Sequence, residues 1–119
     1  MVIVDTSVWV DHFRRGNGVL SRLLEVGEVV CHSFVIGELA CGNFKNREEV
    51  LSLLQALPSA PTLDEDEILY FIEKNRLMGI GLGLVDVHIL AASSLSMIPL
   101  WTTDKKLRSV AKALEIAYE

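Results

Sequence analysis

The chain opens with three consecutive apolar, β-branched residues, Val2 to Val4, which end at Asp5. A short run that is apolar at every position is typical of a central strand buried on both faces. Less uniform runs at 28–31 and 98–103 predict two further strands, and a brief strand within 58–61 and an edge strand at 116–118 are also expected. Apolar residues at helical spacing predict helices at 6–13, 19–26, 34–41, 47–57, 64–78 and 84–97, and another from residue 104 onward.

Polar residues and glycines mark where these elements begin and end. Thr6 with Ser7, Ser33, and Asp104 stand where N-caps are expected, and residues 14–18 read as a turn. Strands that alternate with helices predict an α/β fold on a parallel sheet. The chain shows no repeat or linker, so we expect a single domain over residues 1–119. In such folds ligands bind outside the carboxyl ends of the strands.

Composition narrows the class of protein. Half of the 119 residues are hydrophobic, and eleven basic against sixteen acidic residues give a net charge of −5, which argues against a surface for nonspecific DNA binding. Cys31 and Cys41 form no disulfide framework or zinc motif and are expected to be small buried residues of a reduced protein. No signal peptide or spanning segment is evident, so a cytoplasmic protein with no membrane association is expected.

Four acidic residues stand in unusual surroundings. Asp5 and Asp104 each end an apolar strand, whereas Glu38 and Asp86 lie within apolar helical segments. Each has an ordinary explanation: the first two as helix caps, the other two as residues at a solvated edge. Together they suggest more, because parallel strands and the helix starts beside them bring such residues to one rim. Four carboxylates with few basic partners predict a hard-cation site for Mg²⁺ or Mn²⁺, of the kind that serves phosphate chemistry.

The aromatic and histidine residues give weaker signals. His12 and His32 lie near predicted turns and are expected to be solvated or capping, while His88 interrupts an otherwise apolar helix. A partly buried core residue is the more ordinary interpretation of His88. Trp9 and Trp101 are expected to anchor the core or an interface.

Several motifs resemble one known family. The opening VIVDTS, the segment FVIGELACG at 34–42, the block VDVHILAA at 85–92 and LWTTD at 100–104 are similar to the PIN-domain nucleases, and in particular to VapC-type toxins of type II toxin–antitoxin systems. The four acids follow in the same order, with gaps of 33, 48 and 18 residues between positions 5, 38, 86 and 104. The resemblance covers essentially the whole chain.

This resemblance implies a three-layer α/β/α sandwich on a central parallel sheet and a metal-dependent endoribonuclease that hydrolyses RNA. It assigns the acidic site to Asp5, Glu38, Asp86 and Asp104, with Asp5 and Asp86 preferred as direct metal ligands. Thr102, His88 and Thr6 are carried over as supporting residues. Basic side chains are expected to offset the acidity along an RNA path: Arg14, Arg15, Lys45, Arg47, Lys105, Lys106 and Arg108.

Other functions remain open from the residues alone. A phosphoacceptor domain is disfavoured because Thr6, not an acid, follows Asp5, and a phosphatase with an Asp-x-Asp nucleophile is disfavoured because Ser7 stands at the second position. A stand-alone PIN-like RNA-processing nuclease and a catalytically silent PIN-like binding module both remain as alternatives.

The resemblance also implies partners. An antitoxin segment is expected to bind across apolar helices near the site, on residues that look exposed in the sequence: Trp9, Val10, Phe13, Leu20 and Leu24. The alternative is that these residues complete the core. A homodimer is expected as well.

Overall fold

A three-stranded parallel sheet forms the centre of the protein in a computed structural model that describes all 119 residues. Its strands are β1 (Val2–Val4), β2 (Val29–Val30) and β3 (Leu100–Trp101), in the order β2-β1-β3. Ile3 pairs with Val30 on one side and with Leu100 on the other, and all three residues of β1 are buried. The first apolar run is therefore the central strand, as its composition predicts.

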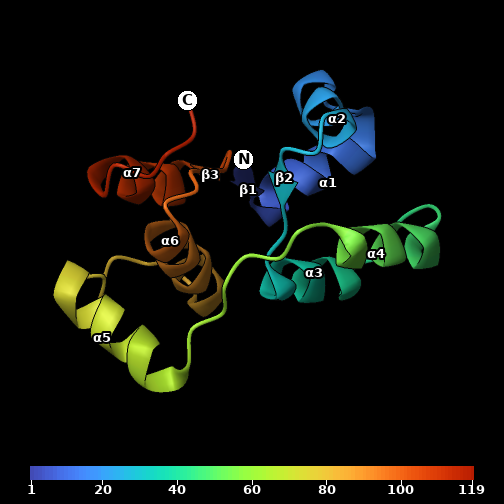
Figure 1. Cartoon of the computed structure of the whole chain (residues 1–119). Coiled ribbons are helices and arrows are strands. Elements are labelled where there is room, and N and C mark those ends of the chain that lie inside the picture. Colours follow the sequence, from blue (N-terminus) through green and yellow to red (C-terminus); the bar gives the residue numbers. More distant parts are fainter.

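Seven helices surround the sheet. They are α1 (Thr6–Arg15), α2 (Gly18–Glu25), α3 (Ser33–Ala40), α4 (Arg47–Ala56), α5 (Glu65–Asn75), α6 (Leu84–Ser96) and α7 (Lys105–Ala113). Figure 1 shows helices on both sides of the strands, with α1 and α4 lying away from α6 and α7. This arrangement is the α/β fold of three layers that the sequence predicts.

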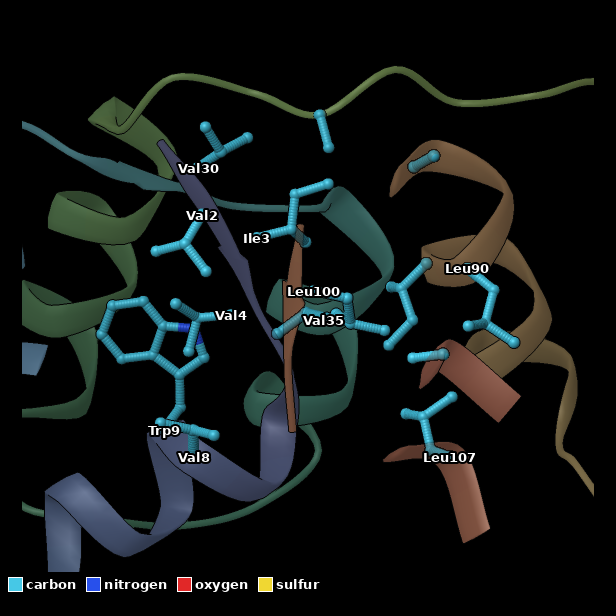
Figure 2. Close-up of a cluster of buried hydrophobic side chains, with 14 of the residues drawn as sticks. Val2, Ile3, Val4, Val8, Trp9, Val30, Val35, Leu90, Leu100 and Leu107 are labelled. Atoms are coloured by element: carbon cyan, nitrogen blue, oxygen red, sulfur yellow. The ribbon is translucent and has the colours of Figure 1, made fainter. Parts of the chain in front are cut away.

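The core divides between the two faces of the sheet. Val8 and Trp9 of α1 pack on one side of β1, and Leu90 and Leu107 lie on the other side (Figure 2). Because successive side chains of a strand point to opposite faces, a three-residue strand that is apolar throughout contributes to both halves of the core. The sheet thereby holds the carboxyl ends of β1 and β3 next to each other.

The strands are shorter than the sequence predicts. The expected strands at 58–61 and 116–118 are present only as single parallel bridges, Cys31 with Ser59 and Leu100 with Ala117. Pro58 and Pro61 restrict pairing on one edge, since proline has no N–H to donate to a ladder.

Two of the expected helix caps are wrong, and the turn predicted at 14–18 is reduced to Gly16 and Asn17, between α1 and α2. Asp5 occupies the N-cap position of α1, so Thr6 and Ser7 lie inside the helix, and α1 continues through Arg15. His32, not Ser33, caps α3: its ring Nδ1 accepts the backbone N–H of Phe34. Asp104 caps α7 as predicted.

Exposure also differs from the sequence-based expectation at several apolar positions. Cys31 is buried, but Cys41 is exposed at the end of α3. Trp9 and Leu20, expected on an exposed binding face, are buried in the core, whereas Val10, Phe13 and Leu24 are only partly covered. None of the helices combines the length and the apolar character that crossing a membrane requires.

Candidate active site

Asp5 follows the last residue of β1 and is buried, with 5% of its surface exposed. Although it occupies the N-cap position of α1, its side chain makes no capping hydrogen bond. Instead Oδ2 accepts hydrogen bonds from the hydroxyls of Ser7 and Thr102, both at 2.7 Å, and Oδ1 accepts none. The ordinary explanation of Asp5 as a helix cap therefore fails.

Two hydroxyl side chains orient this carboxylate. Thr102 lies at the end of β3, where it donates to Asp5 and accepts the backbone N–H of Asp104 at 3.1 Å. Ser7 donates to Asp5 and accepts the N–H of Thr103, also at 3.1 Å. Sequence reasoning had Thr102 as a supporting residue but gave Ser7 only a capping role. Its position two residues after Asp5, at the start of a helix, was the available signal.

Glu38 lies on the last turns of α3 and is exposed. The hydroxyl of Thr6 donates to its Oε1 at 2.6 Å, across 32 residues of sequence. Thr6 thus connects the start of α1 to α3, and the hydroxyl that the sequence assigns to a cap instead orients an acid of the site.

Asp86 stands in the first turn of α6 and is partly buried. Its Oδ2 accepts the backbone N–H of Gly83 at 3.0 Å. Burial raises the pKa of this carboxyl, and the charges of Asp5, Asp104 and Glu38 raise it further, although the Gly83 hydrogen bond acts in the opposite direction. Hydrogen bonds connect the other three acids: Thr102 contacts both Asp5 and the backbone of Asp104, and Thr6, the residue after Asp5, contacts Glu38. The structure therefore brings these acids to the end of β1 and β3, where their charges act on Asp86.

Asp104 is exposed at the N-cap of α7, where its Oδ1 accepts the N–H of Leu107 at 2.9 Å. Its capping role is therefore real. Capping occupies one oxygen only, so it does not exclude a second role for this carboxylate.

One property is common to all four acids: the protein holds each carboxylate through one oxygen, and the other oxygen carries no hydrogen bond. None of them takes part in an ion pair with Lys, Arg or His. As the side chains stand, no three acidic, histidine or cysteine residues form a group that encloses an ion. The donor chemistry nevertheless fits a hard divalent cation, because only carboxylate oxygens are offered and their charges are not otherwise balanced.

Behind the acids lies a cluster of aromatic rings that joins α3 to α6. The ring of His88 lies 4.4 Å from that of Phe34 and 6.3 Å from that of His32, measured between centroids. Both histidines are buried, and His32 Nε2 and His88 Nδ1 have no hydrogen-bond partner. Burial lowers both pKa values, to about 4 for His32, where the nearby His88 also contributes. The expectation of a solvated His32 is wrong, while its capping role is confirmed.

Comparison with known proteins agrees with this architecture. The family model described as the PIN domain matches residues 2–113. The chain is 42% identical over 118 residues to Ribonuclease VapC32 of Mycobacterium tuberculosis, covering 98% of this chain and 95% of that protein. It is 28% identical over 109 residues to Ribonuclease VapC1 of Methanocaldococcus jannaschii, covering 88% and 76% respectively.

Solved structures of low sequence identity share the fold. PAE2754 from Pyrobaculum aerophilum superimposes with a TM-score of 0.70 at 15% identity, covering 98% of this chain and 87% of that one. VapBC2 from Rickettsia felis, solved with a DNA fragment from its promoter, gives a TM-score of 0.66 at 16% identity, covering 92% and 93%. With the family model spanning nearly all of the chain, and a relative at 42% identity over almost its full length, this protein belongs to the PIN-domain family of VapC ribonucleases.

Proposed function

We propose that this protein is a metal-dependent endoribonuclease that hydrolyses RNA phosphodiester bonds and acts as the toxin of a VapBC-type toxin–antitoxin pair. The observation that carries the proposal is the set of four carboxylates at the rim of the sheet, each with one oxygen free. The names of the relatives, ribonucleases VapC32 and VapC1, support the reaction class.

The site suits Mg²⁺ or Mn²⁺, both of which prefer oxygen ligands. Asp5 and Asp86 are the proposed direct ligands, and Glu38 and Asp104 complete the set directly or through water. When bound, such an ion supplies Lewis acidity toward the phosphate and increases the acidity of an attacking water.

The protein's own contribution is orientation. Hydroxyls of Ser7 and Thr102 hold Asp5, and Thr6 holds Glu38, so their unoccupied oxygens stay in fixed positions. Preorganised charge of this kind costs no rearrangement when the reaction begins. His88 is proposed to support the site indirectly. It follows Asp86 by two residues on α6, and its ring packs against that of Phe34 on α3.

An antitoxin is proposed to bind the apolar groove between α1 and α4. This groove has a volume of about 540 Å³, and Trp9, Phe13, Leu24 and Val50 are among its lining residues, with Leu53 exposed at 61%. VapBC2 from Rickettsia felis and FitAcB from Neisseria gonorrhoeae are among the structural neighbours, and their names support an antitoxin partner for this chain. A homodimer of the toxin is also proposed.

Cleavage of RNA by the purified protein tests the reaction. Parent, Asp5→Asn and Asp86→Asn are compared in Mg²⁺, in Mn²⁺ and in chelator, with Asp66→Asn as the control because Asp66 is an exposed acid on α5. Only the parent and the control should cleave, and only with metal. Equal cleavage by Asp86→Asn would contradict the assigned site, and a parent that binds its antitoxin but cleaves no RNA would be a silent binding module.

A further inference from the structure

A second pocket adjoins the acidic site at Glu38. It lies between α1, α3 and the loop that connects α3 to α4, and it has a volume of about 410 Å³. Thr6 and Glu38 line one part of it, and Phe13, Arg14, Phe44 and Lys45 line another. The size lies within the range of roughly 300–1,000 Å³ found for small-ligand sites. The pocket therefore shares Glu38 with the four acids, but its other lining residues are aromatic, basic or apolar.

Two unpaired cations stand in this pocket. Arg14 and Lys45 are exposed, and neither forms an ion pair, whereas the neighbouring Arg15 is paired with Asp11 at 2.7 Å. The chain as a whole carries a net charge of −5. Two free positive charges beside a negative site, on a negative protein, favour a ligand that is itself an anion.

The loop that carries Phe44 and Lys45 is held in place. Arg47 donates from Nε to the carbonyl of Gly42 at 3.1 Å and from its terminal nitrogen to the carbonyl of Ala40. Asn46 turns the chain into α4 with a left-handed φ of 56°. These contacts fix the loop against the end of α3, so the pocket is a built feature of the fold.

Phe44 also binds the loop to α1. Its ring stacks on that of Phe13 with centroids 4.8 Å apart and an interplanar angle of 16°, and both rings remain partly exposed. The pocket thus combines an aromatic wall with two cations within one concave surface. Single-stranded nucleic acids are bound by this pairing of side chains, because bases stack on aromatic rings while the backbone phosphates meet basic residues.

We infer that this pocket is a nucleotide subsite for an unpaired residue of RNA, one that places the neighbouring phosphodiester at the acidic site. Arg14 and Lys45 bind a backbone phosphate, and the base packs against Phe13 and Phe44. This inference rests on the proposed ribonuclease function, and it adds the place where one unpaired nucleotide of the substrate binds. A base within a duplex is stacked on its neighbours and does not enter such a pocket.

Binding measured without cleavage tests the subsite. Fluorescence anisotropy with a short, labelled single-stranded RNA, in chelator, compares the parent with Arg14→Gln, Lys45→Gln and Phe44→Leu. Lys74→Gln and Phe71→Leu are the matched controls, since both residues lie on α5 and neither lines the pocket. Each subsite variant should weaken binding about tenfold, and the two charge variants should lower the salt dependence by about one ion.

The outcomes separate the subsite from the reaction. If Arg14→Gln and Lys45→Gln bind the RNA as tightly as Lys74→Gln does, the subsite is overturned. A duplex that competes as well as the single strand would overturn it too. If these variants bind RNA normally but lose a co-expressed antitoxin, the pocket is a protein-docking site and the inference is wrong. The binding assay needs no metal, so its result does not depend on cleavage. A parent protein that cleaves no RNA would contradict the proposed function but would leave the binding result unchanged. Arg14 is exposed on the last turn of α1, so the Arg14→Gln variant tests the proposal even if Phe44→Leu disturbs the loop.

Discussion

Acid is expected to destabilise this fold through His32. The ring is fully buried at the N-terminus of α3, where Nδ1 accepts the N–H of Phe34 at 3.0 Å. The neutral ring therefore carries its proton on Nε2, which has no partner. A second proton would have to sit on Nδ1, which faces the Phe34 N–H donor, in a fully buried site whose ring centroid is 6.3 Å from that of His88. These conditions explain why burial lowers the pKa of His32 from 6.5 to about 4.

The size of the effect follows from this pKa. A histidine whose folded pKa is depressed binds its proton more readily when unfolded, so folding stability falls as pH drops below 6.5 and continues to fall until about 4. Complete protonation corresponds to about 3 kcal/mol, and the loss between about pH 7.5 and about pH 5 is about 2 kcal/mol. His88, whose pKa burial also lowers, acts in the same direction.

Urea unfolding at the two pH values measures this loss directly. His32→Asn keeps a side-chain acceptor for the Phe34 N–H but removes the titrating ring, and it should lose most of the pH dependence although its stability at neutral pH is lower. His12→Asn is the control, because the Nδ1 of His12 also accepts a backbone N–H but its ring is only partly buried. A pH dependence in His32→Asn as steep as that of the parent would refute the reasoning.

Further predictions concern the site and the partners. Asp86→Asn should leave the stability at neutral pH unchanged or higher. The raised pKa of Asp86 means that its charge destabilises the folded state once the pH exceeds the pKa of the unfolded chain, and Asn can still accept the Gly83 N–H. A large drop in Tm would contradict this prediction. Thr102→Val removes one donor to Asp5 and should cost about 1 kcal/mol of stability together with cleavage activity, to be checked by melting and by RNA cleavage. Leu53→Asp, on an exposed position of the α4 groove, should abolish copurification with the antitoxin while cleavage persists. Light scattering on the isolated protein should give the mass of a dimer, and a monomer at micromolar concentration would exclude it.

Local patterns determined much of the architecture. The run Val2–Val4 is a central strand because no polar residue interrupts it, and Asp104 caps its helix because a carboxylate at that position accepts a free backbone N–H. The capping box of Asp64 and Glu67 marks the start of α5 in the same way. The four acids could be singled out from their apolar surroundings, since that signal also lies within a few residues of each one.

Only the tertiary structure decided what depends on distant residues. Trp9 is buried and Cys41 is exposed because of the helices that cover or fail to cover them. Helical spacing in the sequence does not determine which helices pack together. The hydroxyls of Thr6 and Ser7 appear as caps in the sequence. Thr6 instead donates to Glu38 of α3, and Ser7 donates to the nearby Asp5 while it accepts the N–H of the distant Thr103.

The site illustrates the same division. The sequence by itself determined which residues carry its carboxylates and their order along the chain, because residue type is a local property. It did not determine that Asp86 experiences the charges of three other acids, or that Arg14 and Lys45 line one pocket beside Glu38. Charge interactions and pocket walls depend on distance in space, and that distance is defined only when the sheet brings the ends of its strands and the helices that follow them together.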